Sequence, residues 1–183
     1  MNAQNRDLPL CVDLDGTFWP VDITKILLKS NLNNRQIYRC LIEFLQGGRA
    51  RAKAYLAKIS PIQVDSISIN ANFYSFLVSL HQAGRQIILV TGAPAKIAQQ
   101  VIEAYPIFTD FIASDDYVNC VGVVKGERLA AHFGWQQYVY AGNSWQDIPV
   151  WRGAAQVIGV GCSSNLKWFL QTFLWQEKTF FEG

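Results

Sequence analysis

The sequence predicts an α/β protein in which a parallel sheet is covered by helices on both faces, with a small helical insertion after the first strand. Short apolar segments of strand length alternate with segments whose apolar residues recur at helical spacing. The strand-length segments are almost continuously apolar, which is typical of parallel strands buried on both faces. The chain has 183 residues, of which 50% are hydrophobic and 16% charged. It is therefore expected to fold as one domain, with or without an inserted subdomain.

The core is expected to alternate between strands and helices along the chain. Its helices end at residues of suitable type, as where Gly84 follows the helix over 70–83. The predicted strands span residues 8–14, 86–91, 108–114, 138–141 and 155–160, and the predicted core helices span 70–83, 96–105 and 125–133.

A helical insertion is predicted between the first strand and the rest of the core. Apolar residues at helical spacing indicate helices over 22–30, 36–46 and 51–59. Residues 31–34 interrupt the pattern, the Gly47-Gly48 pair stops the second helix, and Ser60-Pro61 closes the third. We therefore expect an α/β core of residues 1–17 and 69–183 and a helical insertion of residues 18–68.

The net charge of +2 at pH 7 gives the chain no general attraction for nucleic acid, so no nucleic-acid partner is expected. Basic residues do cluster in the insertion, where they indicate either a solvated helix face or a locally positive region. These residues are Arg35, Arg39, Arg49, Arg51 and Lys53.

The cysteines and the N-terminal segment favour a cytoplasmic protein. The N-terminal residues are polar and include no apolar signal region, and no uninterrupted apolar stretch is long enough to cross a bilayer. Cys11, Cys40, Cys120 and Cys162 are scattered and form no CxxC pair, so reduced core residues are favoured over a zinc site or a redox motif.

The segment 166–181 near the C-terminus is unusually rich in aromatic residues. This density suits a core helix, a surface that contacts a partner, or a helix at a membrane interface. The aromatic residues are Trp168, Phe169, Phe173, Trp175, Phe180 and Phe181.

Two aspartates end the first predicted strand. Side chains at positions i and i+2 of a strand point to the same face, so Asp13 and Asp15 are expected to lie together. An ionised Asp13 can attack phosphorus, while Asp15 can hold a proton for the leaving oxygen and later accept one from water. Gly16 permits a sharp turn, and Thr17 places a hydroxyl and an N–H near the same point. Ordinary turn and helix-cap chemistry is the alternative interpretation.

Other predicted strand ends and helix starts carry further polar residues. Thr91, with the N–H of Gly92, can bind a phosphate oxygen, and the Lys125 ammonium can neutralise both a phosphate and a carboxylate. Asn143 and Asp147 offer oxygen ligands of the kind that Mg²⁺ prefers. Each residue alone has an ordinary structural explanation, but together they supply what phosphoryl transfer requires, because ligands of such sheets bind beyond the strand ends.

Over nearly the whole chain, the order of these residues resembles the motifs of the haloacid dehalogenase (HAD) superfamily. The motifs are, in order, Asp-Leu-Asp-Gly-Thr, the strand-end Thr91, Lys125 and Gly-Asn-Ser-Trp-Gln-Asp. The resemblance implies a Rossmann-like core, an aspartyl-phosphate on Asp13, and Asp15 as general acid and base. It further implies that Thr91 and Lys125 contact the phosphate and that the insertion is a cap over the site. Mg²⁺ would be held by Asp13, the Asp15 carbonyl and the last motif, with Asn143 and Asp147.

Two residues qualify this resemblance. Asp15 favours a phosphatase or phosphotransferase, since dehalogenases of the family lack a carboxylate there. Asn143 stands where many members have Asp. Its neutral amide removes one negative charge from the site, which puts the affinity for Mg²⁺ in doubt.

A closer similarity is suggested by Asp-Leu-Asp-Gly-Thr with Asp22 soon after it, and by four further segments. These are Val-Thr-Gly-Ala, Ala-Ser-Asp, Val-Lys-Gly-Glu-Arg-Leu and Ala-Gly-Asn-Ser-x-x-Asp-Ile-Pro-Val-Trp. These segments are similar to the phosphatase-like domain associated with UbiA-type membrane prenyltransferases. The similarity implies a small phosphorylated substrate, such as a phosphosugar or a polyprenyl-linked phosphate. It also implies a location at the inner face of the membrane, with contact through the aromatic segment 166–181.

The leading hypothesis is therefore a Mg²⁺-dependent hydrolase of phosphomonoesters. The alternative is a catalytically weak or inactive domain of the same fold that binds and regulates a membrane prenyltransferase. The bulky Phe18 and Trp19, directly after the aspartate motif, keep that alternative open.

Overall fold

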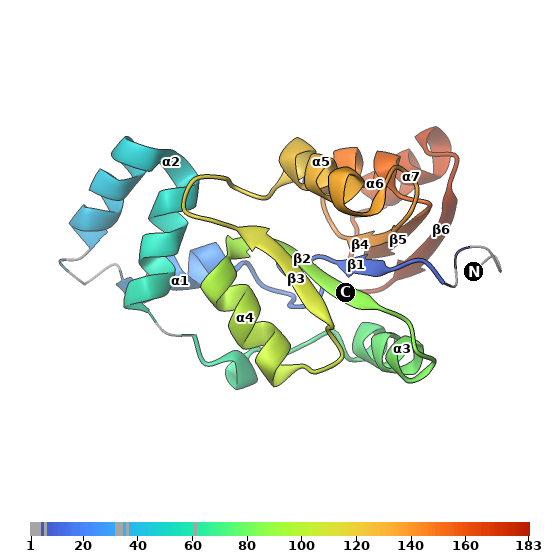
Figure 1. Cartoon of the computed structure of the whole chain (residues 1–183), viewed down its shortest axis with the longest axis horizontal. Helices are drawn as coiled ribbons and strands as arrows, with labels where there is room; N and C mark the ends of the chain where they lie inside the picture. Colours follow the sequence, from blue (N-terminus) through green and yellow to red (C-terminus); the bar gives the residue numbers. More distant parts are fainter. Residues whose placement is uncertain (1–4, 6, 32–34, 36, 61) are drawn as a thin grey trace.

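The computed structural model of the chain describes residues 5, 7–31, 35, 37–60 and 62–183. Within this part of the chain, six parallel strands form one sheet in the order β3-β2-β1-β4-β5-β6 (Figure 1). The predicted α/β fold with a parallel sheet is confirmed. The strands are β1 (Leu10–Val12), β2 (Ile87–Pro94), β3 (Asp110–Ser114), β4 (Val139–Gly142), β5 (Gln156–Val160) and β6 (Glu177–Phe181).

The strand order reverses at β1, which lies between β2 and β4. The next two strands in the sequence, β2 and β3, lie on one side of β1, and β4, β5 and β6 lie on the other. In open parallel sheets, such a reversal creates a crevice beyond the carboxyl ends of the strands where ligands bind. The predicted site residues of β1 and β4 both come from this place.

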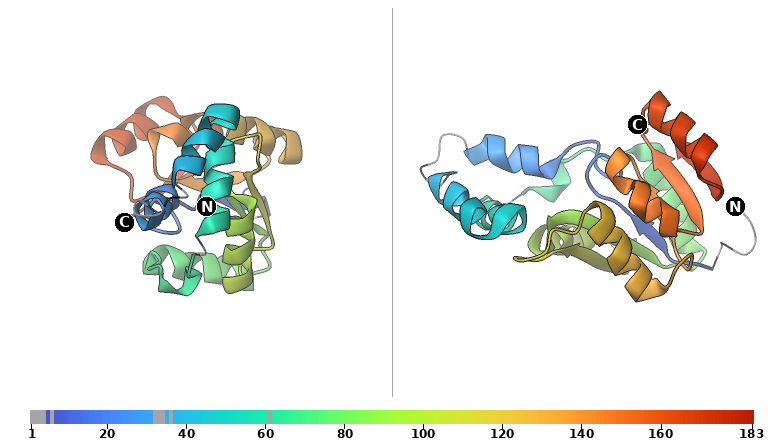
Figure 2. Two further views of the ribbon diagram at one scale, coloured as in Figure 1. Left: turned by 90° about the vertical axis from the view of Figure 1, so that its left-hand side faces the viewer. Right: turned by 90° about the horizontal axis from the view of Figure 1, so that it is seen from above.

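Helices cover both faces of the sheet (Figures 1 and 2). Successive residues of β1 alternate between the two faces: Leu10 and Val12 join one apolar core, and Cys11 joins the other. The first core includes α3 and α4, and the second includes α5, α6 and α7. These helices are α3 (Ala71–Gln82), α4 (Ala95–Ala104), α5 (Gly122–Phe133), α6 (Ile148–Gly153) and α7 (Ser164–Phe173).

The insertion lies beyond one end of the sheet, where Figures 1 and 2 show α1 (Ile23–Asn31) beside α2 (Ile37–Ile59). The chain kinks inside α2 at Gly48, whose φ of 68° lies in the left-handed region that glycine adopts without strain. The predicted helix stop at Gly47-Gly48 is thus present as a kink between two helical halves. A short 3-10 helix, η2 (Val64–Ser66), leads back to the core. Residues 32–34 and 36 and Pro61, which were predicted to bound these helices, lie outside the described residues.

Three core elements, η3, α6 and β6, were not predicted from the sequence. A short 3-10 helix, η3 (Trp145–Asp147), leads into α6, which has Pro149 in its first turn, where proline is compatible with a helix. The third is β6, an edge strand of Glu-Lys-Thr-Phe-Phe that pairs with β5. In addition, α5 begins at Gly122 rather than at Lys125, which places Lys125 within its first turn.

The aromatic segment 166–181 divides into a buried side and an exposed side. Leu166 and Leu170 of α7 are buried in the core, and Phe181 of β6 packs on Phe73 with ring centroids 5.3 Å apart. Trp168 and Trp175 are 61% and 73% exposed. Core packing therefore accounts for only part of the segment.

All four cysteines are free and buried, as predicted. In the part of the chain that the structure describes, no helix combines the length and the apolar character needed to cross a bilayer.

Leu77 tests the packing of α3 on the sheet, because its side chain is fully buried in the first core. We expect Leu77→Ala to lower the free energy of unfolding by about 2–5 kcal/mol, since it removes buried methyl groups and leaves a cavity. Urea denaturation measures this change. Gln82→Ala, at an exposed position of the same helix, is the control and is expected to change it by less than about 0.5 kcal/mol. Equal effects of the two substitutions would contradict the packing described.

Candidate active site

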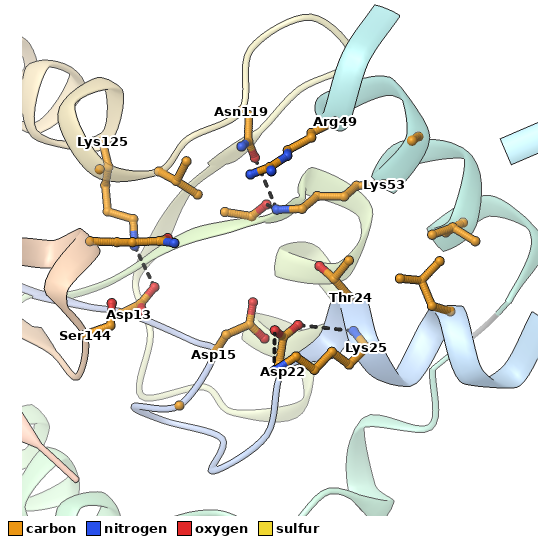
Figure 3. A pocket seen from close by; sticks show the side chains of 18 of the residues that line it. Asp13, Asp15, Asp22, Thr24, Lys25, Arg49, Lys53, Asn119, Lys125 and Ser144 are labelled. Atoms are coloured by element: carbon orange, nitrogen blue, oxygen red, sulfur yellow. Dashed lines mark hydrogen bonds and ion pairs between the residues drawn. The ribbon is translucent and has the colours of Figure 1, made fainter. Parts of the chain in front are cut away.

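A cavity of about 1100 Å³ lies between the carboxyl ends of the strands and the insertion (Figure 3). One wall comes from the core and is polar. The opposite wall comes from α1 and α2 and carries apolar side chains together with a few charged ones. The core residues used below are Asp13, Asp15, Gly16, Gly92, Lys125, Asn143 and Asp147, and the residues of the insertion are Asp22, Leu28, Ile37, Leu41, Phe44, Arg49 and Lys53.

Asp13 and Lys125 form a buried ion pair at the centre of the core wall. The N–H of Asp13 donates to the Ala141 carbonyl of β4 at 2.9 Å, which fixes the residue where β1 ends. The Lys125 Nζ lies 2.6 Å from the Asp13 Oδ1, and the two residues are only 3% and 7% exposed. Such charge-assisted hydrogen bonds hold both partners in a defined geometry.

Burial governs the titration of this pair. It raises the pKa of Asp13 to about 7, although the Lys125 ammonium acts in the opposite direction. Burial alone would lower the pKa of Lys125, but the carboxylates of Asp13 and Asp147 outweigh it and raise that pKa. Lys125 therefore stays charged, and its positive charge favours the ionised form of Asp13.

Tyr140 connects Lys125 to Asp147. Its hydroxyl accepts from the Lys125 Nζ at 2.9 Å and donates to the Asp147 Oδ1 at 2.7 Å. The Lys125 Nζ also lies 3.9 Å from that same carboxylate oxygen. The ammonium is thus held from two sides while it contacts Asp13.

The other oxygen of Asp147 organises the loop after β4. Its Oδ2 accepts from the N–H groups of Asn143 and Ser144, at 3.1 and 3.0 Å, and from the Ser144 hydroxyl at 3.1 Å. Together with Tyr140, these donors occupy about the four hydrogen-bonding positions that a carboxylate offers. Asp147 therefore serves here to shape the loop that carries Asn143.

Asp15 faces the cavity from the turn after β1. Its Oδ1 accepts from the N–H of Ile23 at 2.9 Å, at the first turn of α1. Burial raises the pKa of Asp15, and the Ile23 N–H opposes this shift. A raised pKa lets this carboxyl carry a proton at higher pH than a solvated aspartate.

Gly16 must remain glycine for two reasons. Its φ is +77°, in the left-handed region, and a Cβ there would lie 2.0 Å from the Asn143 Nδ2. The turn after β1 and the loop after β4 therefore approach each other more closely than any other residue allows.

Not every predicted phosphate ligand reaches the cavity. Gly16, Gly92 and Lys125 line it, but Thr17 and Thr91 are buried and do not. The Thr91 hydroxyl accepts from the N–H of Ala93 at 2.9 Å, so it stabilises the end of β2. The Thr17 hydroxyl has no hydrogen-bond partner among the described residues.

Phe18 and Trp19 do not obstruct the site. Both are almost completely buried in the first core, and the Phe18 ring packs edge-on against Phe108 with centroids 5.1 Å apart. Their bulk is therefore explained by core packing.

The sequence identified the charged residues of the core wall but missed several contacts. Of the five clustered basic residues of the insertion, only Arg49 and Lys53 line the cavity. Tyr140 was overlooked because it lies inside an apolar strand, although a buried tyrosine hydroxyl usually needs a partner, and this could have signalled it. Asp22 and Asn119 also line the cavity. Asp22 belongs to the segments that carry the closer similarity, but no sequence pattern set Asn119 apart.

The oxygen donors at the core wall suit a hard divalent ion. Among the described residues, no three His, Cys, Asp or Glu side chains are grouped closely enough to form a metal site by themselves. Mg²⁺, however, needs only one or two carboxylates and completes its shell with water and phosphate oxygens. Asp13, the carbonyl of Asp15 and the amide oxygen of Asn143 are the candidates, since Asn143 contacts the turn that holds both aspartates.

Sequence comparison finds little that is characterised. No family model matches the chain. The chain is 29% identical over 167 residues to the uncharacterized protein y4nM of Sinorhizobium fredii (strain NBRC 101917 / NGR234). The alignment covers 88% of this chain and 31% of that protein, so the chain spans about a third of the length of this curated relative.

Solved structures show the fold clearly. Phosphoserine phosphatase in its apo form matches with a TM-score of 0.65 at 14% identity, over 97% of this chain and 94% of that one. A HAD-family hydrolase from Salmonella enterica subsp. enterica serovar Typhi matches with a TM-score of 0.64 at 14% identity, over 96% and 68%. A phosphoserine phosphatase structure of a phospho-aspartyl intermediate analogue matches with a TM-score of 0.60 at 15% identity, over 97% and 94%. The chain has the fold of HAD-family hydrolases.

Substitution of Lys125 tests the electrostatics of the buried pair. The ammonium stabilises the ionised form of Asp13, so Lys125→Met is expected to raise the pKa of Asp13 above its value of about 7. Carbon NMR of labelled aspartate carboxyl groups, followed against pH, measures this change. Lys167→Met removes a lysine that pairs with Glu182 elsewhere and is expected to leave the Asp13 titration unchanged. A fall in the pKa of Asp13 on loss of Lys125 would contradict this description.

Proposed function

We propose that the protein is a Mg²⁺-dependent phosphatase that hydrolyses a phosphomonoester through an aspartyl-phosphate on Asp13. The observation that carries this proposal is the buried Asp13–Lys125 ion pair at the strand-order reversal, with Asp15 facing the same cavity two residues later. The pair supplies a fixed carboxylate and a cation at one point, as nucleophilic attack on phosphorus requires. The fold, shared with phosphoserine phosphatases, supports the proposal.

The reaction follows from the roles of the two aspartates. An oxygen of Asp13 forms a bond to phosphorus while the bond between phosphorus and the ester oxygen breaks, and Asp15 gives its proton to that leaving oxygen. Water then forms a bond to the phosphorus of the aspartyl-phosphate while the bond between phosphorus and the Asp13 oxygen breaks, and the water gives a proton to Asp15. Inorganic phosphate leaves, and both carboxyl groups return to their starting state. Lys125 neutralises negative charge on the phosphoryl group throughout.

Asp13, the Asp15 carbonyl and Asn143 would hold Mg²⁺ in this proposal. When bound, the ion would neutralise phosphate charge and help to orient the phosphoryl group. Asp147 would support the site indirectly, because its carboxylate is engaged by Tyr140 and by the loop that carries Asn143. This differs from its expected role as a direct metal ligand.

The insertion of residues 18–68 would act as a cap on a core formed by residues 1–17 and 69–183. Its helices line the cavity opposite Asp13, so they can exclude water and select substrates. A small phosphorylated substrate fits a cavity of about 1100 Å³.

The apolar part of the cap wall supports a substrate with an apolar portion. Leu28, Ile37, Leu41 and Phe44 face the cavity, and such a wall favours a polyprenyl-linked phosphate over a simple phosphosugar. A substrate of this kind agrees with a place at the inner face of a membrane and with association with a UbiA-type prenyltransferase. The exposed Trp168 and Trp175 would then provide membrane or partner contact.

A second candidate function is a weakly active or inactive regulatory domain that binds a prenyltransferase. The observation that favours it is that Thr17 and Thr91 do not reach the cavity, which leaves fewer phosphate ligands than the sequence suggested. The intact pair of Asp13 and Lys125 favours the phosphatase.

Phosphate release from 4-nitrophenyl phosphate tests the phosphatase. We expect turnover that depends on Mg²⁺ and that falls by on the order of 10³-fold or more in Asp13→Asn, because the amide is not a nucleophile. Asp116→Asn, at an exposed position outside the cavity, is the matched control and should retain activity. Equal activity of Asp13→Asn and the unaltered protein would rule out the proposed nucleophile, and absence of turnover in both would favour the regulatory domain.

Asp15→Asn separates the two chemical steps. The 4-nitrophenolate leaving group needs little protonation, so formation of the aspartyl-phosphate should persist, while its hydrolysis loses a general base and slows by about 10²-fold or more. Rapid-mixing measurements should show a burst of 4-nitrophenolate followed by slow turnover. Loss of the burst together with the steady rate would argue against this division of roles.

A further inference from the structure

Two cations of the insertion, Arg49 and Lys53, face the cavity from α2. They lie four residues apart, so they occupy the same side of the helix on successive turns. Figure 3 shows both side chains on the far side of the cavity from Lys125, above Asp15 and near Asn119. The cavity therefore has a second positive region, distinct from the Asp13–Lys125 pair.

Lys53 is fixed in place by neutral groups of the core. Its Nζ donates to the Gly92 carbonyl at 3.0 Å and to the Asn119 Oδ1 at 3.2 Å. The Ser114 hydroxyl also donates to the Gly92 carbonyl, at 2.9 Å, and accepts from the Cys120 N–H at 2.8 Å, which makes this anchorage rigid. An ammonium has three donors, so one remains for a ligand, and neither protein acceptor neutralises the charge.

Three other cations of the insertion have partners among the described residues, whereas Lys29, Arg35 and Lys58 are exposed and lie outside the cavity. Arg51 pairs with Glu43 at 2.6 Å, Lys25 pairs with Asp22 at 3.7 Å, and Arg39 lies over the Tyr55 ring at 5.8 Å. Within the described residues, neither Arg49 nor Lys53 forms an ion pair with a carboxylate. Burial lowers the pKa of Lys53, the carboxylates of Asp15 and Asp22 oppose this shift, and the charges of Lys125 and Arg49 add to it. An anionic ligand between Arg49 and Lys53 would offset the repulsion between their positive charges.

The position of the two cations indicates which part of a substrate they contact. The carboxylate of Asp13 faces the phosphorus, and Asp15 protonates the leaving oxygen, so the region beyond Asp15 receives the leaving group. Figure 3 shows the Lys53 side chain above Asp15, so Lys53 lies on that side of the cavity. A second anionic group on the leaving group would thus reach Lys53 and Arg49 while the phosphoryl group stays at Asp13 and Lys125.

We propose that Arg49 and Lys53 form a subsite for a second acidic group, so that the preferred substrates are phosphomonoesters whose leaving group carries a carboxylate, phosphate or phosphodiester. This inference rests on the proposed phosphatase function. The preferred leaving group would therefore have an apolar part that contacts the cap wall and a negatively charged group that contacts α2.

Phenyl phosphate and 4-carboxyphenyl phosphate test the subsite. They share the same ring, and only one bears a second acidic group. The measured quantity is the ratio of their kcat/KM values, compared between variants at constant ionic strength, so that differences in leaving-group chemistry cancel. The unaltered protein is expected to favour the carboxylated ester.

Arg49→Gln is expected to lower this ratio by about tenfold, the usual consequence of losing one charge-assisted hydrogen bond. Lys53→Gln is expected to lower it at least as much, although this change also weakens the anchorage of α2 to Gly92 and Asn119. Arg49 has no such anchoring contact among the described residues, so its variant isolates the charge effect. Lys58→Gln removes an exposed cation of the same helix outside the cavity and should leave the ratio unchanged.

Two results would overturn the subsite. One is a ratio that Arg49→Gln and Lys53→Gln leave unchanged. The other is an equal fall in Lys58→Gln, which would show a general effect of charge.

Binding of both esters, measured by titration calorimetry with the unaltered protein and with Arg49→Gln, tests the subsite without turnover. Tighter binding of the carboxylated ester without hydrolysis of either would support the subsite and refute the phosphatase, whereas hydrolysis of both without preference would do the reverse.

Discussion

The buried ion pair of Asp13 and Lys125 is the interaction on which the site depends. It joins the end of β1, one of the two central strands, to the first turn of α5, and Tyr140 of β4 holds the lysine from the other side. Loss of one partner of such a pair leaves an unpaired buried charge, which typically costs about 3–5 kcal/mol. The pair therefore fixes the Asp13 carboxylate and also constrains how three elements meet. Because the strand order reverses at β1, the loops around this pair open into a cavity instead of closing over it.

The sequence predicted the core well because its strands are short, continuous apolar runs separated by amphipathic helices. The sequence did not predict elements whose hydrophobic pattern is short or weak. The edge strand β6 contains Glu177 and Lys178, which a central strand would not tolerate, and α6 has only six residues, too few for a helical period to show. Within the site, the positions of Asp13, Asp15 and Lys125 could be predicted from strand ends. Whether a hydroxyl turns toward the cavity or toward the backbone could not, and Thr91 turns to the N–H of Ala93.

The insertion shows most clearly what requires the folded chain. Five basic residues lie close together in the sequence, yet only Arg49 and Lys53 face the cavity. Their direction is set by the kink at Gly48, which separates the first half of α2 from the half that carries both residues. Anchorage of Lys53 to Gly92 and Asn119 then brings the insertion against the end of β2. Sequence spacing alone could define neither the kink angle nor this contact. In the proposed function, the phosphoryl chemistry would take place on the core and the leaving group would be recognised by the insertion.

The most direct test of this account is to locate the covalent intermediate. The protein would be mixed with 4-nitrophenyl phosphate and Mg²⁺, quenched in acid within the first turnover, digested, and analysed by mass spectrometry. The account predicts one phosphoryl group on the peptide that contains Asp13, absent from Asp13→Asn and from protein without substrate. A phosphoryl group on another residue, or complete hydrolysis of the ester with no labelled peptide at any time, would contradict the central role of Asp13.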